Sequence, residues 1–303
     1  MADYDYITYE EIDDGTIVRI MLNRPEARNA QNRGMLVELD AAFGRAEADD
    51  DVRVVILGGE GPMFSAGHDM GSKVAMEEYA THPTRAMNGG TREGSEGLML
   101  QEWHYFFQNT LRWRNLRKIT IAQAHGASYA AALMLLWSCD LIVAADDATF
   151  ADVVGTRLGM QGVEYFAHPW EFGPRKTKEL LLTGDAIGAE EAHALGMVSK
   201  IFPADELSER TVEFARRVAQ VPTMAALLIK QSVNQTMDNQ GFTNALQGCF
   251  HLHQLNHSHW ATRTDGPQKR WVATPDDGAL DWRTAPPVQL ADVNTVGGVA
   301  VGD

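Results

Sequence analysis

Three side chains that can perform nucleophilic catalysis stand close together in the stretch GPMFSAGHDM, residues 61–70. Ser65, His68 and Asp69 are the residue types of a nucleophile, its base and the group that orients the base. Triad members normally come from distant segments, and MFSAG lacks the first glycine of the G-x-S-x-G turn. A triad is therefore one interpretation, and an ordinary strand-to-helix turn with Asp69 as its N-cap is another.

A third interpretation uses the backbone of the same turn. Gly67 allows a sharp turn, after which backbone N–H groups point outward at the start of a helix. Such donors stabilise an anion, or the negative charge that develops on a carbonyl oxygen during a reaction. We favour this interpretation, in which the backbone N–H of His68 acts and its imidazole is not required.

An oxyanion hole needs a second donor, and the segment AHGASYAAALMLLWSCD, residues 124–140, offers one. Its pattern predicts a strand, a turn at Gly126, small residues and then an apolar helix. The small side chains of Ala130 and Ala131 would let backbone and ligand approach closely. Taken alone, the segment fits a plain buried helix equally well.

Alternating strand and helix patterns place these turns in an α/β fold. Apolar runs predict strands over residues 16–23, 52–59, 119–126 and 140–146. Helical spacing is found over residues 35–43, 98–116, 128–139 and most of 205–260, and the segments 175–184 and 188–203 indicate two more helices and a short strand. Residues 71–100 are polar and rich in glycine, and we interpret them as a mobile insertion or lid. The chain after Thr264 shows no periodicity and is interpreted as an extended tail.

Composition limits the partners and the compartment. The net charge of −15 over 303 residues disfavours nucleic acid and anionic membranes as partners. Two cysteines indicate a reducing compartment, and the acidic N-terminus lacks the apolar core of a signal peptide. The longest uncharged apolar run, Tyr129–Trp137, is too short to cross a membrane. We expect a soluble, cytoplasmic protein.

Four segments together resemble the crotonase superfamily, which includes enoyl-CoA hydratases and isomerases. They are LNRPEARNA (22–30), GPMFSAGHDM (61–70), HGASYAAALMLLWSCDLIVAADDATF (125–150) and LLLTGDAIGAEEAHALGMVSKIFP (180–203). They occur in the family's order, within a match that covers roughly residues 5–260.

The resemblance implies a crotonase-like spiral of ββα units and an acyl-CoA thioester as ligand. No metal is expected, and no cofactor beyond the CoA that is part of the substrate. The implied organisation is an acyl-CoA-binding core (1–204), a C-terminal helical region used in trimer contacts (205–264) and the tail (265–303). The apolar faces of that helical region favour a homotrimer or a dimer of trimers.

Carried over by position, the oxyanion donors are the backbone N–H groups of His68 and Ala131. They would stabilise the enolate that forms from a thioester carbonyl. The positions implied to contact the substrate are Glu26, Ala27, Arg28, Ala66, Asp69, Met70, Ala130 and Met134.

The departures from the family pattern concern its two hydratase glutamates, which handle the water and the proton. Met134 stands where the first is expected, and Val153, Val154 or Gly155 where the second is expected. Ala131 also replaces a usual glycine. A general acid or base contributes roughly 10²–10⁴ in rate. We therefore expect efficient standard hydration to be lost.

Another carboxylate can take over the proton transfer. Glu164 lies five positions after Gly159, near where some relatives keep a catalytic aspartate. Its alternative role is a helix-start or surface carboxylate, and that of Asp152 is a hydrogen-bond acceptor at a strand end. The side chains of His68 and His104 are weaker candidates.

The segment HLHQLNHSHW, residues 251–260, carries four histidines. His253 and His257 are four positions apart, so they share a helix face and have the spacing of metal ligands. No neighbouring carboxylate, cysteine or H-E-x-x-H pattern accompanies them. We therefore predict no metal site there, and favour an interface or a helix that faces the active site.

The sequence thus predicts an acyl-CoA enzyme of the enoyl-CoA hydratase/isomerase family, a lyase or isomerase with a non-standard substrate or chemistry. The alternative is a weak or inactive acyl-CoA-binding protein that kept the oxyanion hole and lost the carboxylates. Glu164 or Asp152 at the pocket would favour the enzyme. Met134 facing the oxyanion hole, with no carboxylate near the thioester, would favour the binding protein.

Overall fold

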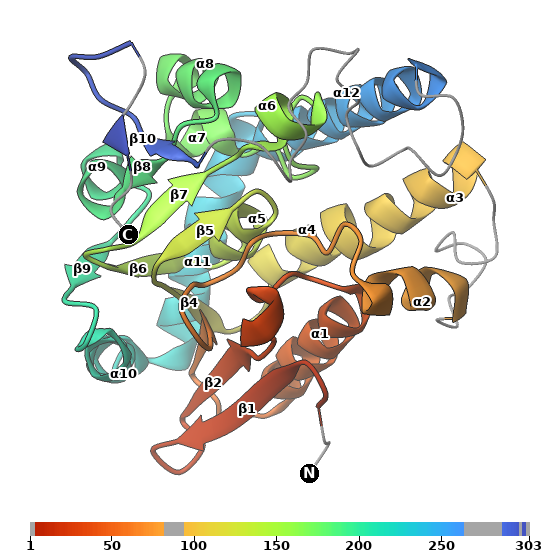
Figure 1. Ribbon diagram of the computed structural model, residues 1–303. Helices are drawn as coiled ribbons and strands as arrows, with labels where there is room; N and C mark the ends of the chain where they lie inside the picture. Colours follow the sequence, from red (N-terminus) through yellow and green to blue (C-terminus); the bar gives the residue numbers. More distant parts are fainter. Residues whose placement is uncertain (1–3, 82–93, 264–286, 297–298, 301–303) are drawn as a thin grey trace.

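The computed structural model describes residues 4–81, 94–263, 287–296 and 299–300 (Figure 1). Its centre is a six-stranded sheet with the order β1-β2-β3-β4-β6-β9. The strands are β1 (Ile7–Ile12), β2 (Ile17–Leu22), β3 (Val54–Gly59), β4 (Ile119–Ala124), β6 (Leu141–Ala145) and β9 (Lys200–Phe202). β1 and β2 form an antiparallel hairpin, and the other neighbours pair in parallel. Four of these strands confirm the predictions, whereas β1 was not predicted.

Two smaller sheets extend this core. β5 (Ala127–Tyr129), β7 (Thr149–Ala151) and β8 (Ile187–Gly188) form a three-stranded sheet. β10 (Gln289–Leu290) and β11 (Val299–Ala300) pair near the C-terminus. Ala186 joins β10 to the three-stranded sheet, because its N–H donates to Gln289 and its carbonyl accepts from Ala291. The predicted extended tail is therefore docked on the core at these residues, while 264–286 lie outside the described part.

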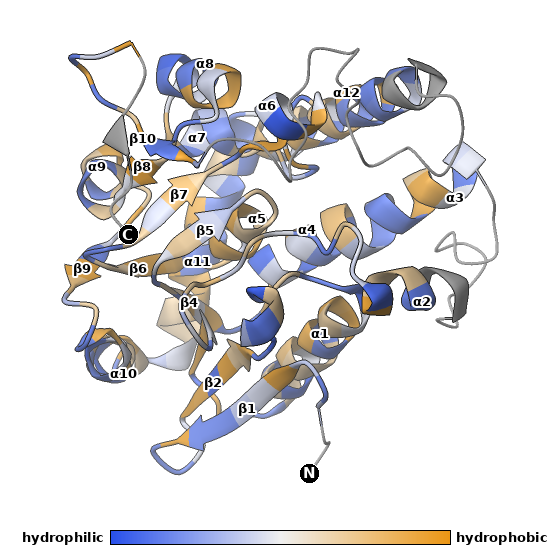
Figure 2. Cartoon of the chain, in the orientation of Figure 1, coloured by the Kyte–Doolittle hydropathy of each residue, from blue (hydrophilic) through white to orange (hydrophobic). Residues whose placement is uncertain are grey.

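Helices cover both faces of the central sheet (Figures 1 and 2). Successive strand residues point to opposite faces, so Val18 packs toward α1 (Arg33–Ala48) and Ile17 packs toward α10 (Leu207–Ala219). The remaining helices of the core are α5 (Ala132–Trp137), α6 (Val154–Leu158), α7 (His168–Glu171), α8 (Pro174–Thr183) and α9 (Ala189–Leu195), with a 3₁₀ turn at Pro25–Ala27. This is the α/β fold with a helical C-terminal region that the sequence predicts.

The segment predicted to be an insertion contains two helices. α2 (Lys73–Thr81) and α3 (Gly94–Gln101) flank residues 82–93, which lie outside the described part. α3 continues through a π-helix (Glu102–Gln108) into α4 (Asn109–Arg114), so the predicted long helix over 98–116 contains one turn of wider winding.

The C-terminal helical region consists of α10, α11 (Thr223–Asn239) and α12 (Phe242–Arg263). On α11 the side chains of Met224, Leu228, Ile229 and Val233 are each more than half exposed. Among the described helices, none has both the length and the apolar content needed to cross a bilayer.

Candidate active site

A cavity of about 800 Å³ lies where the two predicted turns meet, and its walls are mostly apolar. Its lining comes from parts of the segments 27–33, 63–75, 101–106, 129–131 and 153–164, with two residues of α12 and two residues of the tail. A volume of this size is typical of small-molecule sites.

Gly67 brings the two turns into direct contact. Its φ of +93° belongs to the left-handed region, which favours glycine. A Cβ atom added there would lie 2.8 Å from the carbonyl oxygen of Tyr129 and 3.0 Å from the backbone nitrogen of Ala131. The backbone of the first turn therefore approaches the second as closely as van der Waals contact allows.

The backbone N–H groups of His68 and Ala131 differ from those of their neighbours in their hydrogen bonding. The N–H of Gly67 donates to Ser65 Oγ, that of Asp69 to Gln31, and that of Ala130 to Ala151. No protein acceptor within the described ranges receives the N–H of His68 or Ala131, and both residues line the cavity. Two donors left without acceptors beside one cavity are what an oxyanion hole requires. Their catalytic role stays a prediction.

Ser65 supports this turn and is not placed as a nucleophile. Its side chain is fully buried and is not part of the cavity lining. Its hydroxyl donates to the carbonyl of Asn29 at 2.8 Å and accepts from Gly67 N–H at 3.1 Å. The hydroxyl is thus engaged by the backbone that it holds, which argues against the triad interpretation.

Asp69 anchors the far end of the turn. Its carboxylate lies 3.0 Å from Arg24 Nη1 and accepts hydrogen bonds from the hydroxyl and the N–H of Ser72. Burial on its own raises the pKa of Asp69, but the hydrogen bonds from Ser72 and the charge of Arg24 outweigh it, so the pKa is lowered. Asp69 is not the N-cap of α2, because Ser72 Oγ accepts from Ala75 N–H and fills that role.

Glu164 lies in the cavity wall beside the imidazole of His68. Oε2 of Glu164 is 3.3 Å from Nε2 of His68, whose ring stacks on Phe106 with 3.7 Å between the ring centroids. Nδ1 of His68 is buried and has no hydrogen-bond partner among the described atoms. A carboxylate thus orients the imidazole through one nitrogen, while the other nitrogen is buried without a hydrogen-bond partner among the described atoms.

The buried carboxyl of Glu164 is held in its ionised form. Burial raises its pKa, but the charges of His68 and His253, when protonated, outweigh burial and lower it. Nε2 of His253 lies 3.6 Å from Oε1 of Glu164. Glu164 therefore sits between two imidazoles, and the surface-carboxylate alternative is wrong because the residue is only 5% exposed.

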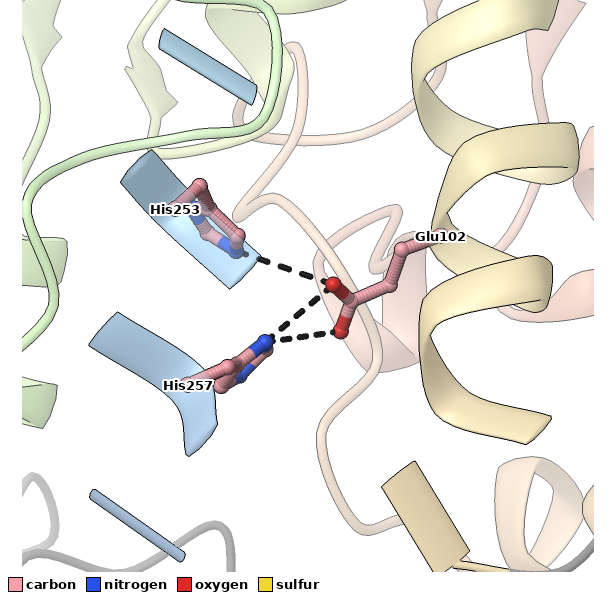
Figure 3. A group of neighbouring side chains, drawn as sticks. All are labelled: Glu102, His253 and His257. Carbon is pink, nitrogen blue, oxygen red and sulfur yellow. Dashed lines mark hydrogen bonds and ion pairs between the residues drawn. The ribbon is translucent and has the colours of Figure 1, made fainter. Parts of the chain in front are cut away.

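Glu102 joins the histidines of α12 from the π-helix (Figure 3). Its Oε2 lies 3.8 Å from Nε2 of His253 and 3.1 Å from Nδ1 of His257. The sequence showed no carboxylate near these histidines, because 155 residues separate Glu102 from His257. An interaction of this span has no local sequence signal. Of the two environments predicted for this helix, the structure shows the one that faces the cavity.

Asp152, the second carboxylate candidate, lies outside the cavity lining. Its carboxylate accepts from the N–H groups of Val154 and Val163, each at 3.0 Å, and lies 2.9 Å from Nε2 of His168. Asp152 and His168 are almost completely buried. This geometry matches the alternative role of a strand-end acceptor.

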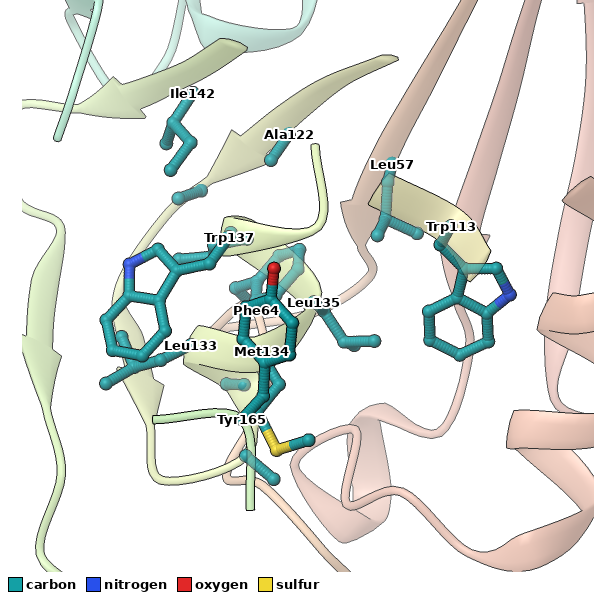
Figure 4. Close-up of a cluster of buried hydrophobic side chains, with 14 of the residues drawn as sticks. Leu57, Phe64, Trp113, Ala122, Leu133, Met134, Leu135, Trp137, Ile142 and Tyr165 are labelled. Atoms are coloured by element: carbon teal, nitrogen blue, oxygen red, sulfur yellow. The ribbon is translucent and has the colours of Figure 1, made fainter. Parts of the chain in front are cut away.

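The predicted substrate contacts divide into two groups. Those in the cavity lining are Ala27, Arg28, Ala66, Asp69, Met70 and Ala130. Glu26 is exposed and outside the lining. Met134 is buried among Phe64, Leu133 and Tyr165 in the hydrophobic core (Figure 4) and does not reach the cavity, because α5 turns it inward. Val153 and Val154 do line it.

Two cavity residues of the tail escaped prediction. Pro287 and Val288 form part of the wall, immediately before β10. Their segment has neither helical nor alternating periodicity, so its apolar residues gave no sign of a buried position. Its pairing with Ala186 brings it to the cavity.

Comparison with known proteins agrees with this geometry. The model of the enoyl-CoA hydratase/isomerase family matches residues 13–266. A Mycobacterium tuberculosis protein named "Putative enoyl-CoA hydratase EchA13" is 66% identical over 293 residues, covering 95% of this chain and 92% of that protein. "4-chlorobenzoyl coenzyme A dehalogenase-2" of an Arthrobacter species is 29% identical, covering 86% of this chain and 90% of that protein.

A solved structure shares the fold. The crystal structure of a "probable" enoyl-CoA hydratase from Mycobacterium smegmatis aligns with a TM-score of 0.76 and 43% identity, over 86% of this chain and 97% of that one. The family match, these identities and the shared fold all point the same way. The chain belongs to the enoyl-CoA hydratase/isomerase family of the crotonase superfamily.

Proposed function

We propose that this protein is an enzyme that moves a proton on an acyl-CoA thioester. The backbone N–H groups of His68 and Ala131 hold the thioester oxygen, and the His68–Glu164 pair carries the proton. The observation that carries the proposal is the 3.3 Å contact between His68 Nε2 and Glu164 Oε2 in the wall of the cavity that both donors line.

The oxyanion hole lowers the barrier to forming an enolate. When a proton leaves the carbon next to the thioester, negative charge moves onto the carbonyl oxygen. Two N–H donors without protein acceptors meet that charge without first giving up a hydrogen bond. Removal of one such donor typically costs about 10²–10³ in rate.

The His68–Glu164 pair acts as one acid/base unit. The carboxylate accepts a hydrogen bond from Nε2 and stabilises the imidazolium, so the pair takes up a proton from the substrate and returns it. A single pair suffices to remove a proton from one carbon and deliver it to another, which shifts a double bond. We therefore favour an isomerase, with addition or loss of a group at the neighbouring carbon as the lyase alternative.

The position of the carboxylate favours an enzyme over a non-catalytic binding protein. A binding protein needs only the oxyanion hole and an apolar wall. Glu164 is buried against two imidazoles in the same wall, an arrangement that binding of a thioester does not require. Groups with this environment are typical of functional sites.

Exchange of substrate protons with deuterated water tests the proposal directly. Wild-type protein, incubated with a panel of saturated and unsaturated acyl-CoA thioesters, should incorporate deuterium into at least one, measured by mass spectrometry. Glu164→Gln should slow exchange by roughly 10²–10⁴. His68→Ala should do the same although it keeps the backbone N–H, and the double variant should be no slower than either single one.

Glu209→Gln, on the exposed face of α10, is the matched control and should exchange like wild type. Unchanged exchange in both Glu164→Gln and His68→Ala would overturn the assignment of the pair. Tight binding of the thioesters without exchange in any of them would favour the binding protein.

A further inference from the structure

A second cluster of reactive side chains borders the cavity, and one of its members, His253, also faces Glu164. Glu102, His253 and His257 each present one potential ligand atom, and these atoms all lie within 4.8 Å of one another. All three residues are more than nine-tenths buried. Figure 3 shows the two imidazoles and the carboxylate converging from α12 and the π-helix.

The two ring nitrogens of His253 have different environments. Nδ1 of His253 lies 3.0 Å from the carbonyl oxygen of Gly162, so this nitrogen carries the proton. Nε2 is buried without a hydrogen bond among the described atoms, and it faces Glu102 at 3.8 Å and Glu164 at 3.6 Å. Two carboxylates that face this nitrogen require a positive charge there, which a second proton on the ring or a bound cation supplies.

The carboxylate of Glu102 shows the complementary feature. Its Oε1 is buried without a hydrogen bond among the described atoms, 3.1 Å from Nδ1 of His257, while Oε2 is bonded to that nitrogen and accepts from the side chain of Gln254. Metal ligands are commonly oriented in this way by outer hydrogen bonds, from a carbonyl to the histidine and from a donor to the carboxylate. Gly162 and Gln254 supply both.

The spacing fits a first-row divalent ion. Ligand bonds of about 2.0–2.2 Å in a tetrahedral site put neighbouring ligand atoms roughly 3.3 Å apart. The observed separations of 3.1 Å and 3.8 Å from Glu102 bracket that value. Imidazole and carboxylate ligands together suit Zn²⁺, Co²⁺ or Fe²⁺ rather than Ca²⁺ or Mg²⁺.

We propose that Glu102, His253 and His257 bind one divalent transition-metal ion, with Zn²⁺ as its representative, in the wall of the acyl-CoA cavity. The positions of the ligands on α12 and the π-helix tie these two helices together through the ion. Three protein ligands leave a coordination position open. The ligands are not the His68–Glu164 pair, although His253 lies 3.6 Å from Glu164, so the site is tested by metal binding and not by turnover.

Direct binding measurements on the full chain, prepared without a histidine tag and treated with a chelator, test this site. Isothermal titration with Zn²⁺ should show one ion per chain, and Co²⁺ should give the visible absorption of a four-coordinate complex. The double variant His253→Gln/His257→Gln should lose affinity by more than the roughly 10–100-fold that loss of an outer-shell partner costs. Glu102→Gln should weaken binding in the same direction.

The helix itself offers a matched control. His251 and His259 lie on α12 with exposed side chains, so His251→Gln/His259→Gln removes as many imidazoles from the same helix. Saturating Zn²⁺ should raise the melting temperature of wild type and of this control, but not of the His253/His257 variant. If that variant does not fold, Gln254→Ala should still weaken Zn²⁺ binding about 10–100-fold. Absent saturable binding in wild type, or equal binding by a folded His253/His257 variant, would overturn the proposal.

Discussion

Nε2 of His68 and Oε2 of Glu164 lie 3.3 Å apart although 96 residues separate them in the chain. The tight turn at Gly67 positions His68, and the loop between α6 and α7 positions Glu164. His68 contributes a backbone N–H and an imidazole to the same cavity, and these two groups can be separated by substitution. The side chain can be removed without loss of the amide, whereas the amide depends on the conformation of the turn.

Gly67→Ala should damage the turn itself. The added methyl group would meet the carbonyl of Tyr129 at 2.8 Å and the nitrogen of Ala131 at 3.0 Å, in a left-handed conformation that alanine disfavours. We expect a loss of about 1–3 kcal/mol in unfolding free energy and a fall in turnover of about 10²–10³. Urea denaturation and thioester turnover measure the two effects. Gly44→Ala, on α1 with open space around the glycine, is the control, and an equally large fall there would contradict this account.

Asp152→Asn should act on stability. Asp152 accepts two backbone N–H groups and pairs with a fully buried His168, so the substitution breaks a buried polar network. We expect unfolding free energy to drop by about 3–5 kcal/mol, measured by urea denaturation. Asp205→Asn, at an exposed position, should change it little. A fully stable Asp152→Asn protein that has lost deuterium exchange would instead make Asp152 catalytic.

The contribution of Asp69 to stability should depend on pH. Its pKa in the folded protein lies below the unfolded value of about 3.9, because hydrogen bonds from Ser72 and the charge of Arg24 outweigh burial. The stabilisation is therefore complete above that unfolded value and is lost as pH falls through the folded pKa.

Asp69→Asn tests this pH dependence. At pH 7 it should lower the unfolding free energy by about 1–3 kcal/mol, and the difference from wild type should shrink in acid. Urea denaturation of both proteins at pH 7 and at successively lower pH measures the difference. If the difference in unfolding free energy between the two proteins stays constant down to the pH of acid unfolding, the charge of Asp69 does not contribute to stability.

The exposed apolar face of α11 should form a subunit interface. Met224, Leu228, Ile229 and Val233 are spread over the exposed face of the helix, and a soluble monomer rarely leaves such an apolar face uncovered. We expect a homotrimer or a dimer of trimers in sedimentation velocity, and Leu228→Glu/Ile229→Glu should shift it toward monomer. Lys178→Glu, at an exposed position on α8, should leave the assembly intact. A wild-type monomer would contradict the prediction.

The parts of the fold that could be predicted from the sequence are those with a local periodic signal. β2, β3, β4 and β6 are apolar runs because both faces of the sheet are covered, and α10 to α12 keep helical spacing. β1 was missed because Ile7 is its only buried residue, as expected for an edge strand. α2 and α3 were not predicted because the glycines of residues 71–100 indicated a loop, although both helices contain several good helix formers.

In the candidate site, too, the features with a local sequence signal could be predicted and the others could not. Turns with glycine and small residues predicted the two segments that carry the backbone donors, and the family resemblance assigned the donors to His68 and Ala131. The direction in which a side chain points could not be predicted from the sequence. Nothing in the local sequence distinguishes Glu164, which faces the cavity, from Asp152, which faces His168. The approach of Glu102 to α12 depends wholly on how two distant helices pack.

The chain reaches the cavity a last time close to its own C-terminus, where Pro287 and Val288 complete the wall and β10 attaches to Ala186. Any ligand that touches these two residues binds more tightly when the tail is attached, and it strengthens the attachment by the same free energy in return. Substrate affinity and the attachment of the C-terminal segment are thus thermodynamically coupled, so a change in one changes the other.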